Sequence, residues 1–115
     1  MSEQRSGQGA ELASRTCEAC RSDTPPMQRE EIAALAPQLP EWEVVEDHHL
    51  RRGLRFKNFR EALEFVNKVG ELAEEQGHHP EIHFGWGHVE LEVWTHKIDG
   101  LTQSDFVFAA KVDRL

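Results

Sequence analysis

Apolar residues recur at two different periods along this chain, and the changes of period divide it into elements. Residues 28–39 carry apolar side chains at helical spacing with acids near the start, which predicts a short helix ending near Pro37. Residues 42–46 and 49–56 follow, and in the second segment apolar and polar positions alternate with a period of two. We therefore expect two strands that turn near Asp47.

The strongest pattern lies at residues 58–76 and predicts a long amphipathic helix. Asn58 is a good N-cap, and Glu61, three positions later, completes a capping-box pattern. Gly77 supplies a stop, because glycine readily adopts the left-handed conformation that ends helices. The apolar stripe at helical spacing consists of Phe59, Ala62, Leu63, Val66, Val69, Gly70 and Ala73.

Two further strands are expected at residues 81–86 and 88–96. In the second, the apolar and polar side chains alternate strictly, so that one side is buried and the other is accessible. The buried side consists of Val89, Leu91 and Val93, and the accessible side of His88, Glu90, Glu92, Trp94 and His96.

A closing helix is expected at residues 102–112, with Thr102 as its cap and Asp105 at its third position. Its apolar side consists of Phe106, Ala109 and Ala110. The order helix, two strands, helix, two strands, helix indicates an α+β fold, a four-stranded antiparallel sheet with three helices on one face. The other face, which carries Trp94 and His96, would be open to a ligand or another subunit.

Residues 1–24 are polar, and all three tryptophans and all six phenylalanines come after Thr24. We expect a flexible N-terminal tail at 1–24 and one domain at 25–115, so that a chain beginning near Pro25 would keep its fold and activity. A core of roughly 90 residues is marginal for a lone monomer, so association with further copies would help stability.

Net charge and hydropathy exclude several classes of partner. The chain has 21 acidic and 13 basic residues and a net charge of -8, which argues against a nucleic-acid surface. No apolar run approaches the ~20 residues that span a bilayer, so no membrane partner is expected. The N-terminus has no apolar signal-peptide core, and the expected compartment is the cytoplasm.

The two cysteines form a single Cys-x-x-Cys at Cys17 and Cys20. A structural zinc site usually needs four ligands, and there is no second pair. A thioredoxin-like motif would follow a strand and open a helix, and this motif does neither. In a reducing compartment we expect free thiols.

Histidine is the residue type best placed for chemistry here. His78 and His79 follow the end of the long helix, Glu74 lies one turn before His78, and His96 comes later. Imidazoles titrate near neutral pH, and a carboxylate at i, i+4 can orient one, which suits acid–base catalysis. Spacing alone leaves two alternatives open: surface polarity at a helix end, and a catalytic metal set of three histidines and an acid.

A longer motif includes these residues. It runs from Glu74 through His78-His79-Pro80 to Trp94-Thr95-His96, and then from Gly100-Leu101 to Asp105. With Trp42 and the Phe56-x-x-Phe59 entry to the long helix, it resembles the pterin-4a-carbinolamine dehydratases, particularly bacterial members, over residues 28–115.

The resemblance implies an enzyme, a 4a-hydroxytetrahydrobiopterin dehydratase, which is a hydro-lyase that needs no metal or organic cofactor. It implies His78, His79 and His96 as the catalytic residues, and substrate binding by Glu74, Trp42 and Asp105. It also points to a homodimer or homotetramer. The chain departs from vertebrate members at Gly77, where they carry an acid, and at Ser104, where they carry an arginine.

The implied reaction eliminates water from a 4a-hydroxytetrahydropterin to give the quinonoid dihydropterin. We expect His79 or His96 to protonate the leaving hydroxyl and His78 to act as base or orienting partner. The reaction would recycle the pterin cofactor of aromatic amino-acid hydroxylases, with a possible functional link to such an enzyme. The alternative is a dimerisation or regulatory binding module without catalysis, which would not require the histidine trio.

Overall fold

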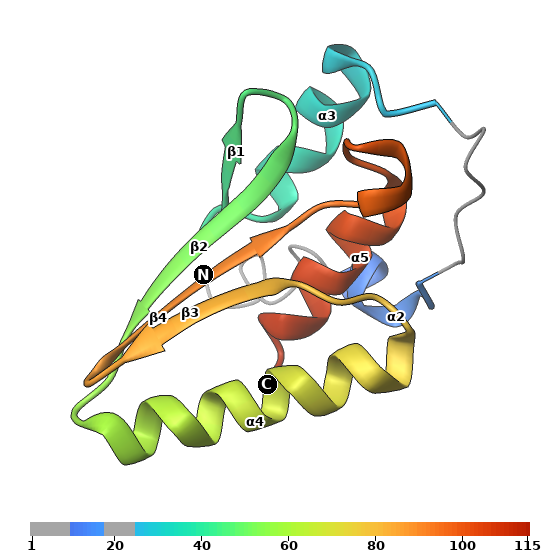
Figure 1. Cartoon of the computed structure of the whole chain (residues 1–115). Helices are drawn as coiled ribbons and strands as arrows, with labels where there is room; N and C mark the ends of the chain where they lie inside the picture. The colour runs from blue at the N-terminus through green and yellow to red at the C-terminus, as the bar shows by residue number, and fades with distance from the viewer. Residues whose placement is uncertain (1–9, 18–24) are drawn as a thin grey trace.

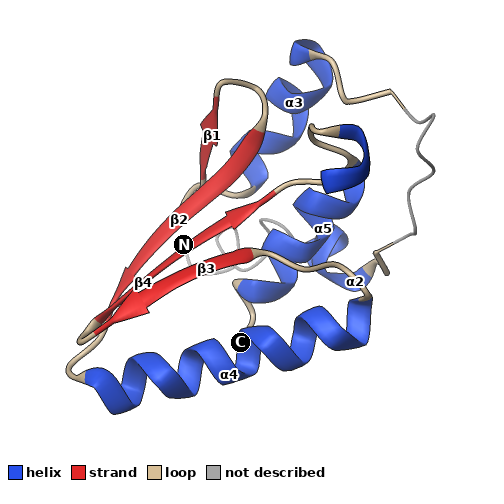
Figure 2. Ribbon diagram, in the orientation of Figure 1, coloured by secondary structure: helices blue, strands red, loops and turns tan. Residues whose placement is uncertain are grey.

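The structure is a computed structural model that describes residues 10–17 and 25–115 (Figure 1). Its sheet has four antiparallel strands in the order β1-β2-β4-β3, so that β1 and β3 form the two edges. The predicted α+β class with helices packed on an antiparallel sheet is confirmed (Figure 2). In chain order the elements are α2 (Ala10–Ser14), α3 (Arg29–Leu35), η1 (Ala36–Gln38), β1 (Glu43–Val45), β2 (His49–Arg55), α4 (Phe59–Gln76), β3 (Glu81–Gly85), β4 (His88–Val93), η2 (His96–Ile98) and α5 (Gln103–Val112).

The predicted long helix is confirmed as α4. The Asn58 side chain accepts a hydrogen bond from the backbone N–H of Glu61 at 2.9 Å. The Glu61 carboxylate accepts from the backbone N–H of Lys57 rather than from that of Asn58, so the capping box is shifted by one residue. Gly77 ends the helix in the left-handed conformation, with φ at 64°.

The core lies between the sheet and the helices. Val89, Leu91 and Val93 of β4 are at most 1% exposed, which confirms the predicted alternation of this strand. Ile32 of α3 and Leu50 of β2 complete the same apolar cluster. Because apolar burial contributes about 25 cal/mol per Å², these side chains fix which face of the sheet the helices cover.

Helix α5 is buried on every side. Val107, Phe108 and Val112 are at most 2% exposed, although the predicted apolar side named only three other residues of this helix. The reason is that α2 packs along α5 and covers the side that the sheet does not reach (Figure 1). A helix that is apolar all round is a buried helix, so this composition already indicated a second cover.

In the structure, residues 10–17 of the expected flexible tail pack against the domain instead. Leu12 is 1% exposed and belongs to the core cluster, and Cys17 is buried beside it. Leu12 is the large apolar side chain by which this short helix packs against α5. The rest of the predicted tail, residues 1–9 and 18–24 with Cys20, lies outside the described residues.

The remaining boundaries differ slightly from the predicted ones. The first helix ends at Leu35 and continues as the 3-10 helix η1, because Pro37 has no N–H for an α-helical hydrogen bond. Glu46 and Asp47 form the β1–β2 turn with φ near 55°. Among the described residues, no helix combines the length and the apolar character needed to cross a bilayer.

Candidate functional site

His78 and Asp105 form a hydrogen-bonded pair between α4 and α5. The left-handed Gly77 turns the chain at the end of α4 and directs it toward α5. The His78 Nε2 atom lies 2.6 Å from Asp105 Oδ1, and the His78 side chain is 11% exposed. A carboxylate has no proton to give, so Nε2–H is the donor, and Nδ1 of the neutral imidazole carries the lone pair.

The Asp105 carboxylate accepts three hydrogen bonds. Its Oδ2 atom accepts from the Thr102 backbone N–H at 2.8 Å, which closes the capping box of α5, and from Thr95 Oγ1 at 2.8 Å. The residue is completely buried. Both carboxylate oxygens are hydrogen-bonded inside the protein, and Oδ1 pairs with His78. The implied substrate-binding role of Asp105 stays a prediction.

Glu74 pairs with His79 and not with His78. Glu74 Oε2 lies 2.6 Å from His79 Nε2, and the two side chains are 79% and 60% exposed. The predicted i, i+4 contact between Glu74 and His78 is wrong, because the chain leaves the helical path at Gly77 and turns His78 toward α5. The exposed pair can exchange protons with solvent or with a ligand.

His96 lies beyond the strand on which it was predicted. Strand β4 ends at Val93, and His96 opens η2. The reason is a tight loop closed by backbone hydrogen bonds between Thr95 and Gly100, which turns the chain out of the sheet. The His96 ring stacks on Trp94 with centroids 4.4 Å apart.

Asp105 links the two segments that carry the predicted histidines. This carboxylate binds His78 directly, and it binds Thr95, the residue before His96. His79 is the neighbour of His78. Thr95 was part of the motif but was not predicted as a site residue, and a threonine before a histidine gives little signal by itself.

The structure does not bring Trp42 to these histidines. Its Nε1–H donates to Asp113 Oδ1 at 2.9 Å, and the residue is 7% exposed. Asp113 follows Asp105 by eight positions, about 12 Å along the axis of α5. Burial raises the pKa of the Asp113 carboxyl, and the Trp42 hydrogen bond and the Arg52 guanidinium partly offset this.

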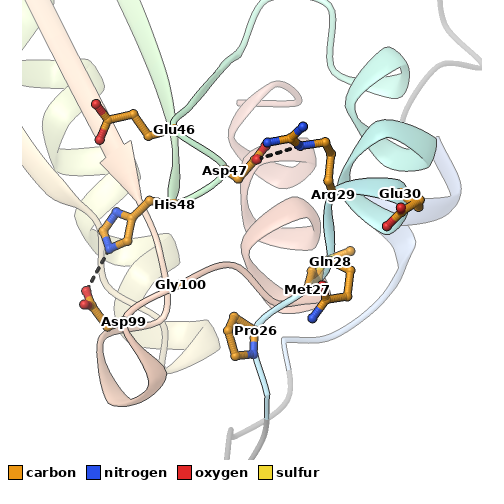
Figure 3. A pocket seen from close by; sticks show the side chains of 10 residues that line it. All are labelled: Pro26, Met27, Gln28, Arg29, Glu30, Glu46, Asp47, His48, Asp99 and Gly100. Carbon is orange, nitrogen blue, oxygen red and sulfur yellow. Dashed lines mark hydrogen bonds and ion pairs between the residues drawn. The ribbon is translucent and has the colours of Figure 1, made fainter.

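A separate open hollow of 610 Å³ lies between the segment before α3, the β1–β2 turn and the loop after η2 (Figure 3). His48 Nε2 lies 2.7 Å from Asp99 Oδ1 across it, and Arg29 pairs with Asp47 at 3.1 Å. None of the predicted site residues lines it. Within 10–17 and 25–115, no three His, Cys, Asp or Glu side chains lie together in a way that could hold a metal ion.

Comparison with known proteins gives a consistent family. The family model described as pterin 4 alpha carbinolamine dehydratase matches residues 25–115. A Rubrobacter xylanophilus protein with the provisional name pterin-4-alpha-carbinolamine dehydratase is 68% identical over 106 residues, covering 92% of this chain and 99% of the relative. An Alkaliphilus metalliredigens protein with the same provisional name is 53% identical, covering 90% of this chain and 94% of the relative.

Two solved structures share the fold. The Brucella melitensis transcriptional coactivator/pterin dehydratase has a TM-score of 0.72 and 27% identity, covering 77% of this chain and 96% of its own. A pterin dehydratase-like protein identified as a RuBisCO assembly factor in the alpha-carboxysome has a TM-score of 0.56 and 26% identity, covering 64% of this chain and 87% of its own.

Proposed function

Because the chain belongs to the pterin-4-alpha-carbinolamine dehydratase family, we propose that it eliminates water from a 4a-hydroxytetrahydropterin. The observation that carries the proposal is the buried Asp105–His78 pair with the exposed Glu74–His79 pair next to it. The His78 imidazole is held by Asp105 through Nε2, and the His79 imidazole is exposed to solvent. This difference suits a base and an acid acting on one substrate.

In the proposed reaction, the C4a–O bond breaks as the N5–H electron pair forms the C4a=N5 double bond. His78 Nδ1 accepts the N5 proton. Nε2 carries the hydrogen that is donated to Asp105, which leaves the lone pair on Nδ1. A second histidine, His79 or His96, protonates the departing hydroxyl to give water. Protons given and taken balance, so the products are the quinonoid dihydropterin and one water molecule.

Glu74 favours His79 as the acid. If His79 Nε2–H donates to this carboxylate, Nδ1 carries the proton that is transferred, and the ring keeps its hydrogen-bond partner as imidazolium and as neutral imidazole. His96, whose ring stacks on Trp94, is the second candidate for the acid. Positioned proton transfer of this kind is typically worth about 10²–10⁴ in rate.

We further propose that this reaction recycles the pterin cofactor of aromatic amino-acid hydroxylases. We also propose that the working form of the protein is a homo-oligomer. The second candidate is a binding module without catalysis. It is favoured by one observation, that a solved relative of this fold is an assembly factor for another enzyme. A pure binding role gives no reason for the buried Asp105–His78 pair.

A stopped-flow assay of 4a-carbinolamine breakdown, with and without the protein, tests the proposal. We expect acceleration by the wild type and its loss in His78→Ala. His83→Ala is the matched control, because His83 is an exposed histidine on β3 outside the proposed site. A wild-type protein that leaves the spontaneous rate unchanged would refute the dehydratase function and favour the binding module.

A further inference from the structure

The segment Ala10–Cys17, which we call the N-terminal strap, is fixed to α5 by side-chain and backbone contacts. Leu12 is 1% exposed within the core cluster. Lys111 Nζ donates to the Ala13 carbonyl at 2.8 Å, and Arg15 donates to the Gln103 side chain at 3.3 Å. The strap is therefore docked near both ends of α5 (Figure 1).

The end of the strap is bonded to both elements that carry the His78–Asp105 pair. The Cys17 backbone N–H donates to Gln76 Oε1, in the last turn of α4, at 3.0 Å. The Cys17 thiol lies 3.5 Å from the Ser104 carbonyl oxygen, in the first turn of α5. In the sequence, Gln76 precedes His78 by two residues, and Ser104 directly precedes Asp105.

This bridge has a geometric consequence for the pair. His78 and Asp105 stand on different elements, and the 2.6 Å hydrogen bond between them exists only while the end of α4 and the start of α5 keep their separation. Misplacement of a catalytic group by about 1 Å can lower a rate by as much as about 10²-fold. A contact that joins the residues flanking both partners can therefore keep this separation fixed.

From this geometry we infer that the N-terminal strap is a positioning element of the active site, with Leu12 as its anchor and Gln76 as its receptor. The inference rests on the proposed function, since it assigns the strap to the base of that reaction. It replaces the expectation that the residues before Pro25 are dispensable. A strap that only shields the apolar side of α5 would contribute to stability and leave the chemistry unchanged.

The test compares two pairs of full-length variants. Leu12→Asp places a charge in the buried anchor position and releases the strap. Glu11→Gln changes an exposed neighbour on the same helix and keeps an acceptor for Arg15. Gln76→Ala removes the acceptor of the Cys17 N–H, while Gln76→Glu keeps an oxygen there. Each is assayed for kcat and KM well below its own melting temperature, and the His78 imidazole nitrogens are followed by NMR.

For Leu12→Asp we expect kcat to fall about tenfold with KM within about twofold of the wild type, because the anchor is remote from substrate. The His78 nitrogen resonances should move with it. Gln76→Ala should lose about threefold in kcat and Gln76→Glu should regain most of it. Glu11→Gln should match the wild type in all readouts.

Wild-type kcat and unmoved His78 resonances in Leu12→Asp and Gln76→Ala would overturn the inference, whatever happens to the melting temperature. The two proposals fail separately. If the wild type does not accelerate dehydration, the proposed function is refuted, and the NMR comparison alone decides whether the strap positions His78. If the wild type is active and the variants are equally active with unmoved resonances, only the strap inference is lost.

Discussion

Asp105 Oδ1 and His78 Nε2 lie 2.6 Å apart, although the two residues are 27 positions apart in the chain. The carboxylate is completely buried and satisfies the cap of α5, the Thr95 hydroxyl and the imidazole at the same time. A helix cap, which is a device of local stability, here also determines the direction and the tautomer of the proposed base.

Asp105→Asn should reduce both stability and activity. The amide offers one oxygen and one NH₂ group to three donors, so at least one buried donor loses its acceptor. We expect a loss of about 1–3 kcal/mol in the free energy of unfolding and at least about tenfold in kcat. Urea unfolding and stopped-flow kinetics measure the two effects. Wild-type turnover in a destabilised Asp105→Asn protein would contradict the role of Asp105 as orienting partner.

His79→Ala and His96→Ala should separate catalysis from folding. Both residues are exposed, so the melting temperature should stay close to that of the wild type. One of these two residues is the proposed acid, and replacing that residue should lower kcat at least about tenfold. If both variants turn over like the wild type, neither imidazole protonates the leaving hydroxyl and the mechanism is wrong.

Asp113 gives a pH dependence of stability with a defined sign. Burial raises the pKa of its carboxyl in the folded state, so between the ordinary and the raised pKa the folded protein binds more protons than the unfolded chain. This contribution to stability is greatest in acid and falls as pH rises through that window. The variant Asp113→Asn does not titrate there and keeps an acceptor for Trp42.

The measurement is the difference in unfolding free energy, wild type minus Asp113→Asn, across the acidic range. We expect the difference to fall as pH rises and then to level off. A difference that rises with pH would show that the Arg52 charge outweighs burial and that the pKa is lowered instead.

A homo-oligomer, at least a dimer, remains our prediction for the working form. Within residues 10–17 and 25–115, the outer edge of β3 is not paired with another strand. Trp86, in the turn after β3, is 71% exposed, and Phe59 of α4 is 46% exposed. Unpaired strand edges and exposed aromatic side chains favour association. Sedimentation equilibrium at micromolar concentration measures the mass. A single species near 13.2 kDa with full activity would contradict the prediction.

The sequence by itself determined the elements whose signals are local. Helix α4 begins after Asn58 and ends before Gly77 as predicted, because a cap, a 3.6-residue stripe and a stop each act within a few residues. The alternation in β4 likewise identified its buried face, since neighbouring side chains on a strand point to opposite sides. His78, His79 and His96 were chosen as candidate site residues because imidazole suits acid–base catalysis near neutral pH.

Only the tertiary structure decided which side chains meet. The spacing of an ideal helix predicted a contact between Glu74 and His78. Because of the left-handed turn at Gly77, Glu74 pairs with His79 and His78 pairs with Asp105. The docking of Leu12 against α5 depends on a surface built from residues about 90 positions away, which no window around Leu12 contains. Side-chain partners depend on the relative placement of whole elements, and that placement is set by packing of the complete core.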